Sequence, residues 1–145
     1  GLSYPIGMRW VNKDIKEYIT RAPLKIDKNG GIVLSADIKE GEEISLMMGD
    51  KEWVLESAKT AALKAMDDIK NSEIKFAVML SDISRLYLLR KDAKKEIDAV
   101  KEIIGKNVPI LGCYTFGEYM PFSVNETLSQ FHFNNQSISI ALFAE

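Results

Sequence analysis

The pattern of apolar and polar positions changes character near Asp50. Before that residue, apolar side chains occur in short extended runs separated by turns, and after it they recur at helical spacing. The strongest turn signal is Asn29-Gly30-Gly31, because Asn-Gly supplies the two positive-φ positions of a tight hairpin. The sequence therefore predicts a β-rich first third, with a hairpin joining extended runs at 20–27 and 32–38 and further strands at 4–11 and 43–48.

The remaining two thirds alternate helical patterns with apolar strands. The spacing predicts helices over 51–70 and 92–104, and Asp50 and Gly105 are suited to begin the first and end the second. The residues expected to face the core from these helices are Val54, Ala58, Ala61, Ala65 and Ile69 in the first, and Ala93, Ile97, Val100 and Ile104 in the second.

Three apolar runs in the same region predict strands at 74–80, 108–114 and 137–143. The first is almost continuously apolar, which is typical of a strand covered on both faces. The fold class expected is α/β, with α+β as the alternative: a mixed sheet with a hairpin-rich first third and two main helices packed on the sheet. Residues 1–145 are expected to form one domain.

The order strand 43–48, helix, strand 74–80, helix, strand 108–114 predicts two successive βαβ units in one sheet. The carboxyl ends of parallel strands meet at one edge, where open α/β sheets tend to bind ligands. The loops at 81–90 and 114–125 leave that edge, so we expect any binding residues there.

Composition narrows the function classes. The net charge is −2 and no basic block is present, which argues against a nucleic-acid partner. No apolar run reaches the roughly 18 residues that a membrane-spanning helix needs, so no membrane insertion is expected. The chain begins at Gly1, which suggests a piece of a longer natural protein.

Two charged residues in the expected edge loops are candidates for ligand contacts. Arg85 lies among apolar neighbours, and its guanidinium is suited to holding a carboxylate by two hydrogen bonds. Its alternative is an internal ion pair or a surface position. Glu118 lies in an apolar turn and could accept hydrogen bonds from a ligand ammonium. Its alternative is an ion pair within the protein, including one with Arg85 itself.

Other candidates carry weaker signals. Asn134, Asn135 and Gln136 either wall a polar pocket or make a turn, and Tyr114 and Phe116 either cover a ligand or join the core. Cys113, His132 and Glu118 together would suit nucleophilic catalysis, but Cys113 lies within a predicted strand and is interpreted as a structural residue. We therefore expect no catalytic residue, no metal site and no cofactor.

Three segments, in order, resemble the C-terminal half of the FIST domain over about residues 20–143. They are Lys39–Leu46 (KEGEEISL), the loop Gly112–Glu118 (GCYTFGE) and Asn135-Gln136-Ser137. Between the first two, an apolar strand leads to Arg85. The sequence departs from the family pattern at Ser81, where a cysteine is common, and at Leu86, where a glycine is expected.

The resemblance implies a cytoplasmic sensory module of prokaryotic signal-transduction proteins that binds amino acids or related small molecules. The ligand-binding residues it implies are Arg85, Glu118, Tyr114, Asn135 and Ser81. The expected partners are a small-molecule ligand, the N-terminal FIST half or a downstream signalling domain, and a second copy in a homodimer. Residues 1–19 would then be either part of this domain or the end of a preceding segment.

Two other functions stay open. An interaction or dimerisation domain without a small ligand is the main alternative, and a small hydrolase or transferase is the third. Arg85 pointing into a cavity at the 81–90/114–125 edge would favour the sensor. An exposed apolar patch, with Arg85 paired internally, would favour the interaction domain.

Overall fold

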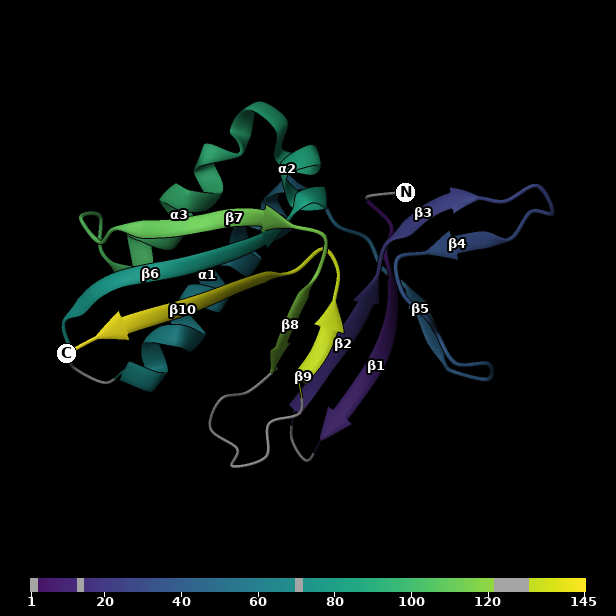
Figure 1. The fold of residues 1–145 in the computed structure, drawn as a ribbon, viewed down its shortest axis with the longest axis horizontal. Coiled ribbons are helices and arrows are strands. Elements are labelled where there is room, and N and C mark those ends of the chain that lie inside the picture. The colour runs from purple at the N-terminus through teal and green to yellow at the C-terminus, as the bar shows by residue number, and fades with distance from the viewer. Residues whose placement is uncertain (1–2, 13–14, 70–71, 122–130) are drawn as a thin grey trace.

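A computed structural model describes residues 3–12, 15–69, 72–121 and 131–145. The prediction of a mixed α and β fold is confirmed (Figure 1). The elements, in chain order, are β1 (Ile6–Asn12), β2 (Ile15–Arg21), β3 (Pro23–Ile26), β4 (Ile32–Leu34), β5 (Ile44–Leu46), α1 (Lys51–Ile69), β6 (Ile74–Asp82), α2 (Ile83–Leu89), the 3-10 helix η1 (Arg90–Asp92), α3 (Lys94–Ile104), β7 (Ile110–Thr115), β8 (Glu118–Pro121), β9 (Phe131–Asn134) and β10 (Ile138–Ala144).

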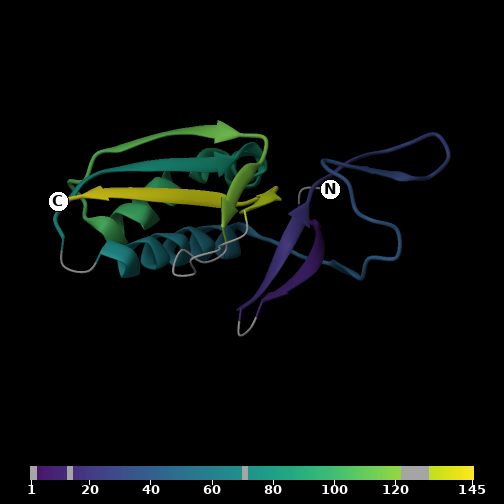
Figure 2. The same ribbon diagram turned by 60° about the horizontal axis from the view of Figure 1, so that its bottom comes forward.

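The main sheet has the strand order β10-β6-β7, with β6 parallel to β7 and antiparallel to β10. Helices α1 and α3 cover one face of this sheet (Figures 1 and 2). The predicted helices over 51–70 and 92–104 are confirmed as α1 and α3. As predicted, Asp50 caps α1 by accepting a hydrogen bond from the Trp53 amide at 2.9 Å, and Gly105 ends α3 with a φ of 116°.

The core lies between these helices and the sheet. Small residues on α1 allow the helix to approach the strands closely, and Ala58 and Ala62 are fully buried. Of the core positions predicted on α1, Val54 and Ala58 are buried and Ala61 is half-buried. The buried core residues that form one cluster are Ala58, Ala62, Ala77, Met79, Val100, Ile104 and Ile138.

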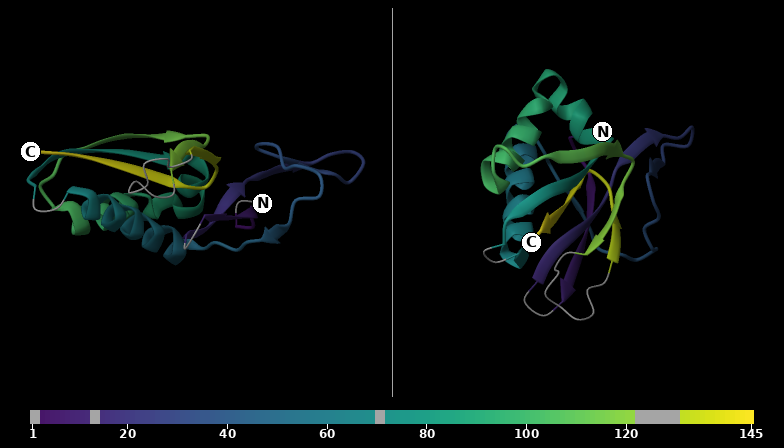
Figure 3. Two further views of the ribbon diagram at one scale, coloured as in Figure 1. Left: turned by 90° about the horizontal axis from the view of Figure 1, so that it is seen from below. Right: turned by 60° about the vertical axis from the view of Figure 1, so that its left-hand side comes forward.

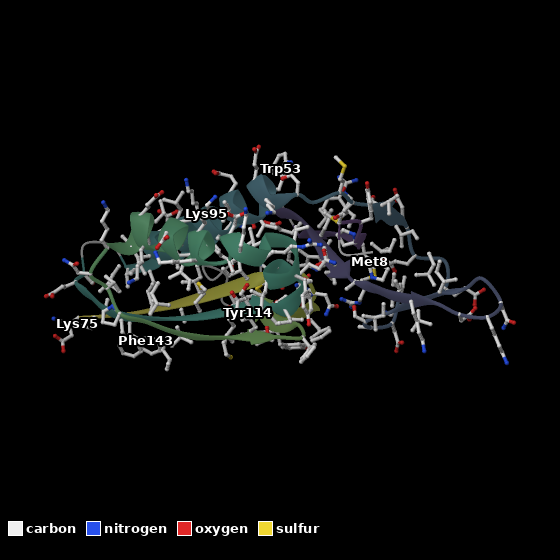
Figure 4. The ribbon with its side chains drawn as sticks, turned by 90° about the horizontal axis from the view of Figure 1, so that it is seen from above. Met8, Trp53, Lys75, Lys95, Tyr114 and Phe143 are labelled. Atoms are coloured by element: carbon white, nitrogen blue, oxygen red, sulfur yellow. The ribbon has the colours of Figure 1, made fainter. Side chains whose placement is uncertain are left out.

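Among the described elements, no helix lies on the other face of the main sheet (Figure 3). Phe143 points away from the helices, and its ring stacks on that of Phe76 at 4.3 Å (Figure 4). Because strand residues alternate between faces, the same face carries the outward residues of all three strands. We call it the open face, and it consists of Phe76, Val78, Leu80, Leu111, Cys113, Ser139, Ala141 and Phe143.

Two expectations about this face are wrong. Strand β6 was predicted to be covered on both faces, yet within the described residues only the helix side is covered. Cys113 was interpreted as a structural residue within a buried strand, yet it is exposed. Both errors have one physical cause. An apolar strand pattern shows which side chains are unfavourable in water, but it does not show whether another element of the chain covers them.

The N-terminal third is β-rich, as predicted. Strand β1 lies between β2 and β5 and is antiparallel to both. The predicted hairpin is confirmed as β3 and β4, which project away from the main sheet (Figure 1). Its turn is held by Asp27, whose carboxylate accepts from the amides of Asn29 and Gly31 at 2.8 Å each.

The prediction of two successive βαβ units is half wrong. Strand β5 is the predicted strand at 43–48, but it pairs with β1 and lies outside the main sheet. Its end is fixed there because the Met47 amide donates to the Pro5 carbonyl at 2.9 Å. Of the strand pairs in the described residues, only β6 and β7, which are connected through α2 and α3, are parallel.

Several elements went unpredicted. The segment at 81–90, expected to be a loop, holds α2, and the segment at 114–125 contains β8. The remainder of the latter, from 122 on, lies outside the described residues. Strands β2 and β9 were also missed.

A glycine in β7 gives a test of the sheet packing. A Cβ on Gly112 would lie 2.2 Å from the carbonyl oxygen of Met79 in the neighbouring strand. We expect Gly112→Ala to lower the free energy of unfolding by about 1–3 kcal/mol, the range for overpacking. Chemical denaturation measures it. Gly49→Ala, where nothing lies within 4 Å of the added Cβ, is the control. Equal stability of the two variants would contradict the close approach.

Candidate functional site

The carboxyl ends of β6 and β7 share an edge, as predicted, with Asp82 beside Thr115. Ser81 and Asp82 are consecutive strand residues, so their side chains point to opposite faces of the sheet. The polar residues at this edge therefore form two groups. One lies on the helix side around Arg85, and the other surrounds Glu118.

The helix-side group centres on a buried ion pair between Arg85 and Glu96. The side chains of Arg85 and Glu96 are 4% and 0% exposed. The Nε and Nη2 atoms of Arg85 both lie 2.7 Å from Oε1 of Glu96. Of the alternatives for Arg85, the structure shows the internal ion pair, and its partner is Glu96 rather than Glu118.

Further hydrogen bonds complete this group. Arg85 donates from Nη1 to the Ser57 hydroxyl at 3.1 Å and from Nη2 to the Val54 carbonyl at 2.8 Å. Ser81 donates its hydroxyl to Oε2 of Glu96 at 3.0 Å. The guanidinium thus lies within the protein and links α1, α2 and α3, with Ser81 adding β6.

Tyr114 lies at the rim of this group. It is paired with Ser81 in register, so its side chain shares the helix side, and it is 38% exposed. Burial raises the pKa of its phenol, the negative charge of Glu96 raises it further, and Arg85 acts in the opposite direction. Tyr114 is therefore a partly exposed side chain with a neutral phenol.

The second group surrounds Glu118, which is 3% exposed. The hydroxyls of Thr115 and Ser137 donate to its two carboxylate oxygens. Burial raises the pKa of Glu118, and the charge of Asp82 adds to this, whereas the two hydroxyls and Arg85 counteract it. Among the described residues, Glu118 forms no ion pair.

Asp82 is a second buried carboxylate at this edge, 3% exposed. It caps α2 by accepting hydrogen bonds from the amide, at 2.8 Å, and the hydroxyl of Ser84. Within the described residues, it has no ion-pair partner either. Two buried carboxylates therefore share this end of the sheet.

Asn135 belongs to neither group, because its side chain connects distant segments. Its amide nitrogen donates to the Phe116 carbonyl at 2.9 Å, and its amide oxygen accepts from the Ser35 hydroxyl at 2.6 Å. Its backbone amide donates to the Thr20 carbonyl at 3.2 Å. Next to it, Asn134 accepts from the Thr20 amide at 3.0 Å.

Gly117 fits against this junction. A Cβ there would lie 2.4 Å from the Phe133 ring and 2.9 Å from the Asn135 amide nitrogen, and its φ is 144°. The loop that carries Glu118 therefore needs glycine for space and for backbone conformation.

The remaining candidates lie apart from these groups. The His132 ring meets that of Trp10 edge-on at 4.9 Å, and burial lowers its pKa. Cys113 lies on the open face. Over the described part of the chain there is no group of three or more His, Cys, Asp or Glu suited to a metal ion. In the same residues, no helix is long and apolar enough to cross a membrane.

Sequence reasoning missed four partners at this edge: Glu96, Asp82, Thr115 and Ser137. A signal existed for Glu96, which is one helical turn before Val100 and so shares the predicted core face of α3. The strand alternation could have separated Ser81 from Asp82. Nothing in the sequence pattern indicated that Ser137 would meet Glu118, because that contact depends on β10 pairing with β6.

An open depression in the surface lies at the opposite end of the sheet. Its volume is about 400 Å³. Its lining residues come from the start of β6 and the connection from α3 to β7 (Glu73, Ile74, Lys75 and 105–109). It includes none of the candidate residues.

Comparison with known proteins gives one match. The model of the FIST C domain family matches residues 1–121, which is most of the chain. The match includes the Gly112–Glu118 loop and ends before Asn135. No curated protein and no solved structure matches the chain.

Because the ion pair is buried, a single substitution should lower folding stability much more than substitution of both partners. Arg85→Met leaves the Glu96 carboxylate buried without its partner, and we expect a loss of about 3–5 kcal/mol of folding stability. Arg85→Met combined with Glu96→Leu removes both charges and should recover most of that loss. Urea denaturation of the set measures it.

The control is Lys94→Ala, which removes an exposed i,i+4 pair with Asp98 and should change stability by no more than about 0.5 kcal/mol. A double variant as unstable as Arg85→Met would contradict this account of the pair.

The raised pKa of Glu118 predicts a pH effect on stability. A carboxyl whose pKa is higher in the folded state binds more protons there, so its contribution to stability falls as pH rises from the unfolded pKa through the folded one. Glu118→Gln removes this dependence. The stability of the variant relative to the wild type should therefore increase between pH 5 and pH 7.5, as measured by urea denaturation at both pH values. A difference that is constant or shrinks would refute a raised pKa.

Proposed function

We propose that this chain, which belongs to the FIST C family of sensory signal-transduction domains, binds a small ammonium-bearing ligand related to an amino acid. The binding edge is the carboxyl end of β6 and β7, with Glu118 as the acceptor for the ammonium. The chain acts as a cytoplasmic input module, without catalysis of its own. It passes its state to the N-terminal FIST half or to a downstream signalling domain.

The observation that carries this proposal is the environment of Glu118. Among the described residues Glu118 has no cation as an ion-pair partner, and burying a carboxylate in this way is costly; a second carboxylate, Asp82, adds to the cost. Hydroxyl groups from Thr115 and Ser137 hold its oxygens in place. A primary ammonium is a compact cation with three donors, and it would neutralise this excess negative charge.

The five predicted ligand-binding residues have two different roles in this proposal, ligand contact and positioning of the edge. We assign ligand contact to Glu118, whose carboxylate oxygens each have a further lone pair beyond the hydroxyl that they accept, and to the partly exposed Tyr114. Ser81, Arg85 and Asn135 already use their polar atoms within the protein, so we assign them to positioning the edge. Contact of Arg85 with a ligand carboxylate stays a prediction, and it would require the guanidinium to leave Glu96.

An interaction domain without a small ligand is the second candidate. Two observations favour it: Arg85 is paired internally, and the open face exposes large apolar side chains. The Glu118 group lies at the carboxyl edge, where the open face continues into Asp82 and Thr115, so the two functions would use adjoining parts of the sheet.

A thermal-shift screen tests the ligand proposal. The probes are amino acids, their amides, which keep the ammonium but lack a free carboxylate, and short carboxylic acids, which lack the ammonium. We expect stabilisation by ammonium-bearing compounds and none by simple acids. Calorimetric titration of Glu118→Gln should then show binding lost, because removing one partner of a buried charged pair costs about 2–5 kcal/mol.

The control is Asp92→Asn, which removes a carboxylate that pairs with Lys51 and Lys95 outside this edge. It should leave binding unchanged. Equal affinity of Glu118→Gln and wild type, or stabilisation by the acids alone, would refute the assignment of Glu118.

A further inference from the structure

Within the part of the chain that the structure describes, the parallel strands β6 and β7 have one apolar face that no other element covers. Parallel strands are normally covered on both faces. On the open face, Leu111 is 72% exposed, Phe143 46% and Phe76 40%. None of the eight residues of this face carries a charge, and the same side of the sheet continues into Asp82 and Thr115 at its carboxyl edge.

A second apolar surface lies on the hairpin of β3 and β4, residues 23–34, which we call the arm. Ile26 pairs directly with Ile32 across the hairpin, and Leu24 is two residues before Ile26. These three side chains are 74%, 58% and 63% exposed, respectively. The arm exposes apolar side chains that its own body does not cover.

The base of the arm is fixed to the body. The Ala22 amide donates to the Ser35 hydroxyl at 2.8 Å, and the Ser35 amide donates to the Ala22 carbonyl at 2.9 Å. The Ser35 hydroxyl in turn donates to Asn135 at 2.6 Å. A surface held in this way is preorganised for binding, because less conformational freedom is lost on association.

The arm and the main sheet lie at opposite ends of the long axis of the molecule (Figure 1). We propose that two copies of this chain form a closed two-fold dimer in which the arm of each copy covers the open face of the other. A two-fold rotation about an axis perpendicular to the long axis reverses that axis in the second copy, so it brings each arm to the partner's main sheet and makes both contacts at once.

The exposed area favours this arrangement over packing of one open face on another. With roughly 150–200 Å² for a large apolar side chain, the three large residues of the open face expose about 300 Å², and the three of the arm expose a similar area. Stable interfaces bury about 800 Å² per partner. Face-to-face packing uses only the first area, whereas reciprocal arm contacts use both and come close to that requirement.

The test uses the 145-residue chain and two variants at exposed positions, Ile26→Lys on the arm and Leu111→Glu on the open face. Sedimentation velocity over a concentration series measures the mass. We expect a two-chain mass for the wild type and at least about 30-fold weaker dimerisation for each variant, as at interface hot spots. Leu63→Glu, at a residue 52% exposed on α1, should leave the dimer intact.

Mixing the two variants provides the deciding result. The mixed pair has one unaltered contact and one in which the new lysine meets the new glutamate, so it should dimerise more tightly than either variant alone. That recovery also shows that both variants are folded. Recovery is not expected if open faces pack on each other, because the arm would then be irrelevant.

The labelling rate of the native Cys113 thiol measures whether the open face is covered, so no substitution at this residue is needed. Its reaction with a small thiol reagent should be slower in the wild-type dimer than in Ile26→Lys.

Four results would each overturn the proposal. They are a monomeric wild type, a dimer that Ile26→Lys leaves unchanged, a mass that grows without limit with concentration, and equal labelling rates. None of these readouts depends on a small ligand, so the proposal stands or falls independently of the function assigned to Glu118.

Discussion

The ion pair between Arg85 and Glu96 joins more of the α/β part than any single apolar contact does, because its hydrogen bonds reach α1, α2, α3 and β6. A charge at this depth is stable only while its partners stay in place. The three helices are therefore held in one arrangement relative to β6. The apolar core of alanine, valine and isoleucine side chains supplies most of the burial, but such contacts tolerate sliding in a way that a fixed pair of charges does not.

The elements that could be predicted from the sequence are those with a local sequence signal. The helices α1 and α3, the arm hairpin and the strands β6, β7 and β10 were predictable, because each has a local pattern of apolar spacing, a cap or a turn. Strand β5 was predictable as a strand but not in its pairing, because the residues of β1 that it pairs with are 36 to 40 positions away in the chain and no local signal marks them. Helix α2 was missed because its seven residues are too short for a clear helical period.

The site was predictable in location and not in its contacts. Parallel strands bring their carboxyl ends together, which places residues 81–85 and 114–118 at one edge from topology alone. Which acid Arg85 meets depends on the phase of α3 and on the strand alternation at Ser81 and Asp82. A shift of one residue in that helix or strand pattern changes which acid, Glu96 or Glu118, faces Arg85. With Glu96 as the partner of Arg85, Glu118 has no ion pair among the residues that the structure describes.

The loop that carries Glu118 and the base of the arm share one side chain. Asn135 donates to the Phe116 carbonyl and accepts from the Ser35 hydroxyl, and the ring of Phe133 leaves room for only a glycine at position 117. A shift of this loop must either move Asn135 with it or break hydrogen bonds of buried groups, which is costly. Because Asn135 also binds Thr20, such a shift reaches β2 as well as the arm. The charged edge of the sheet and the arm are therefore parts of one hydrogen-bonded unit, although about 80 residues of chain separate them.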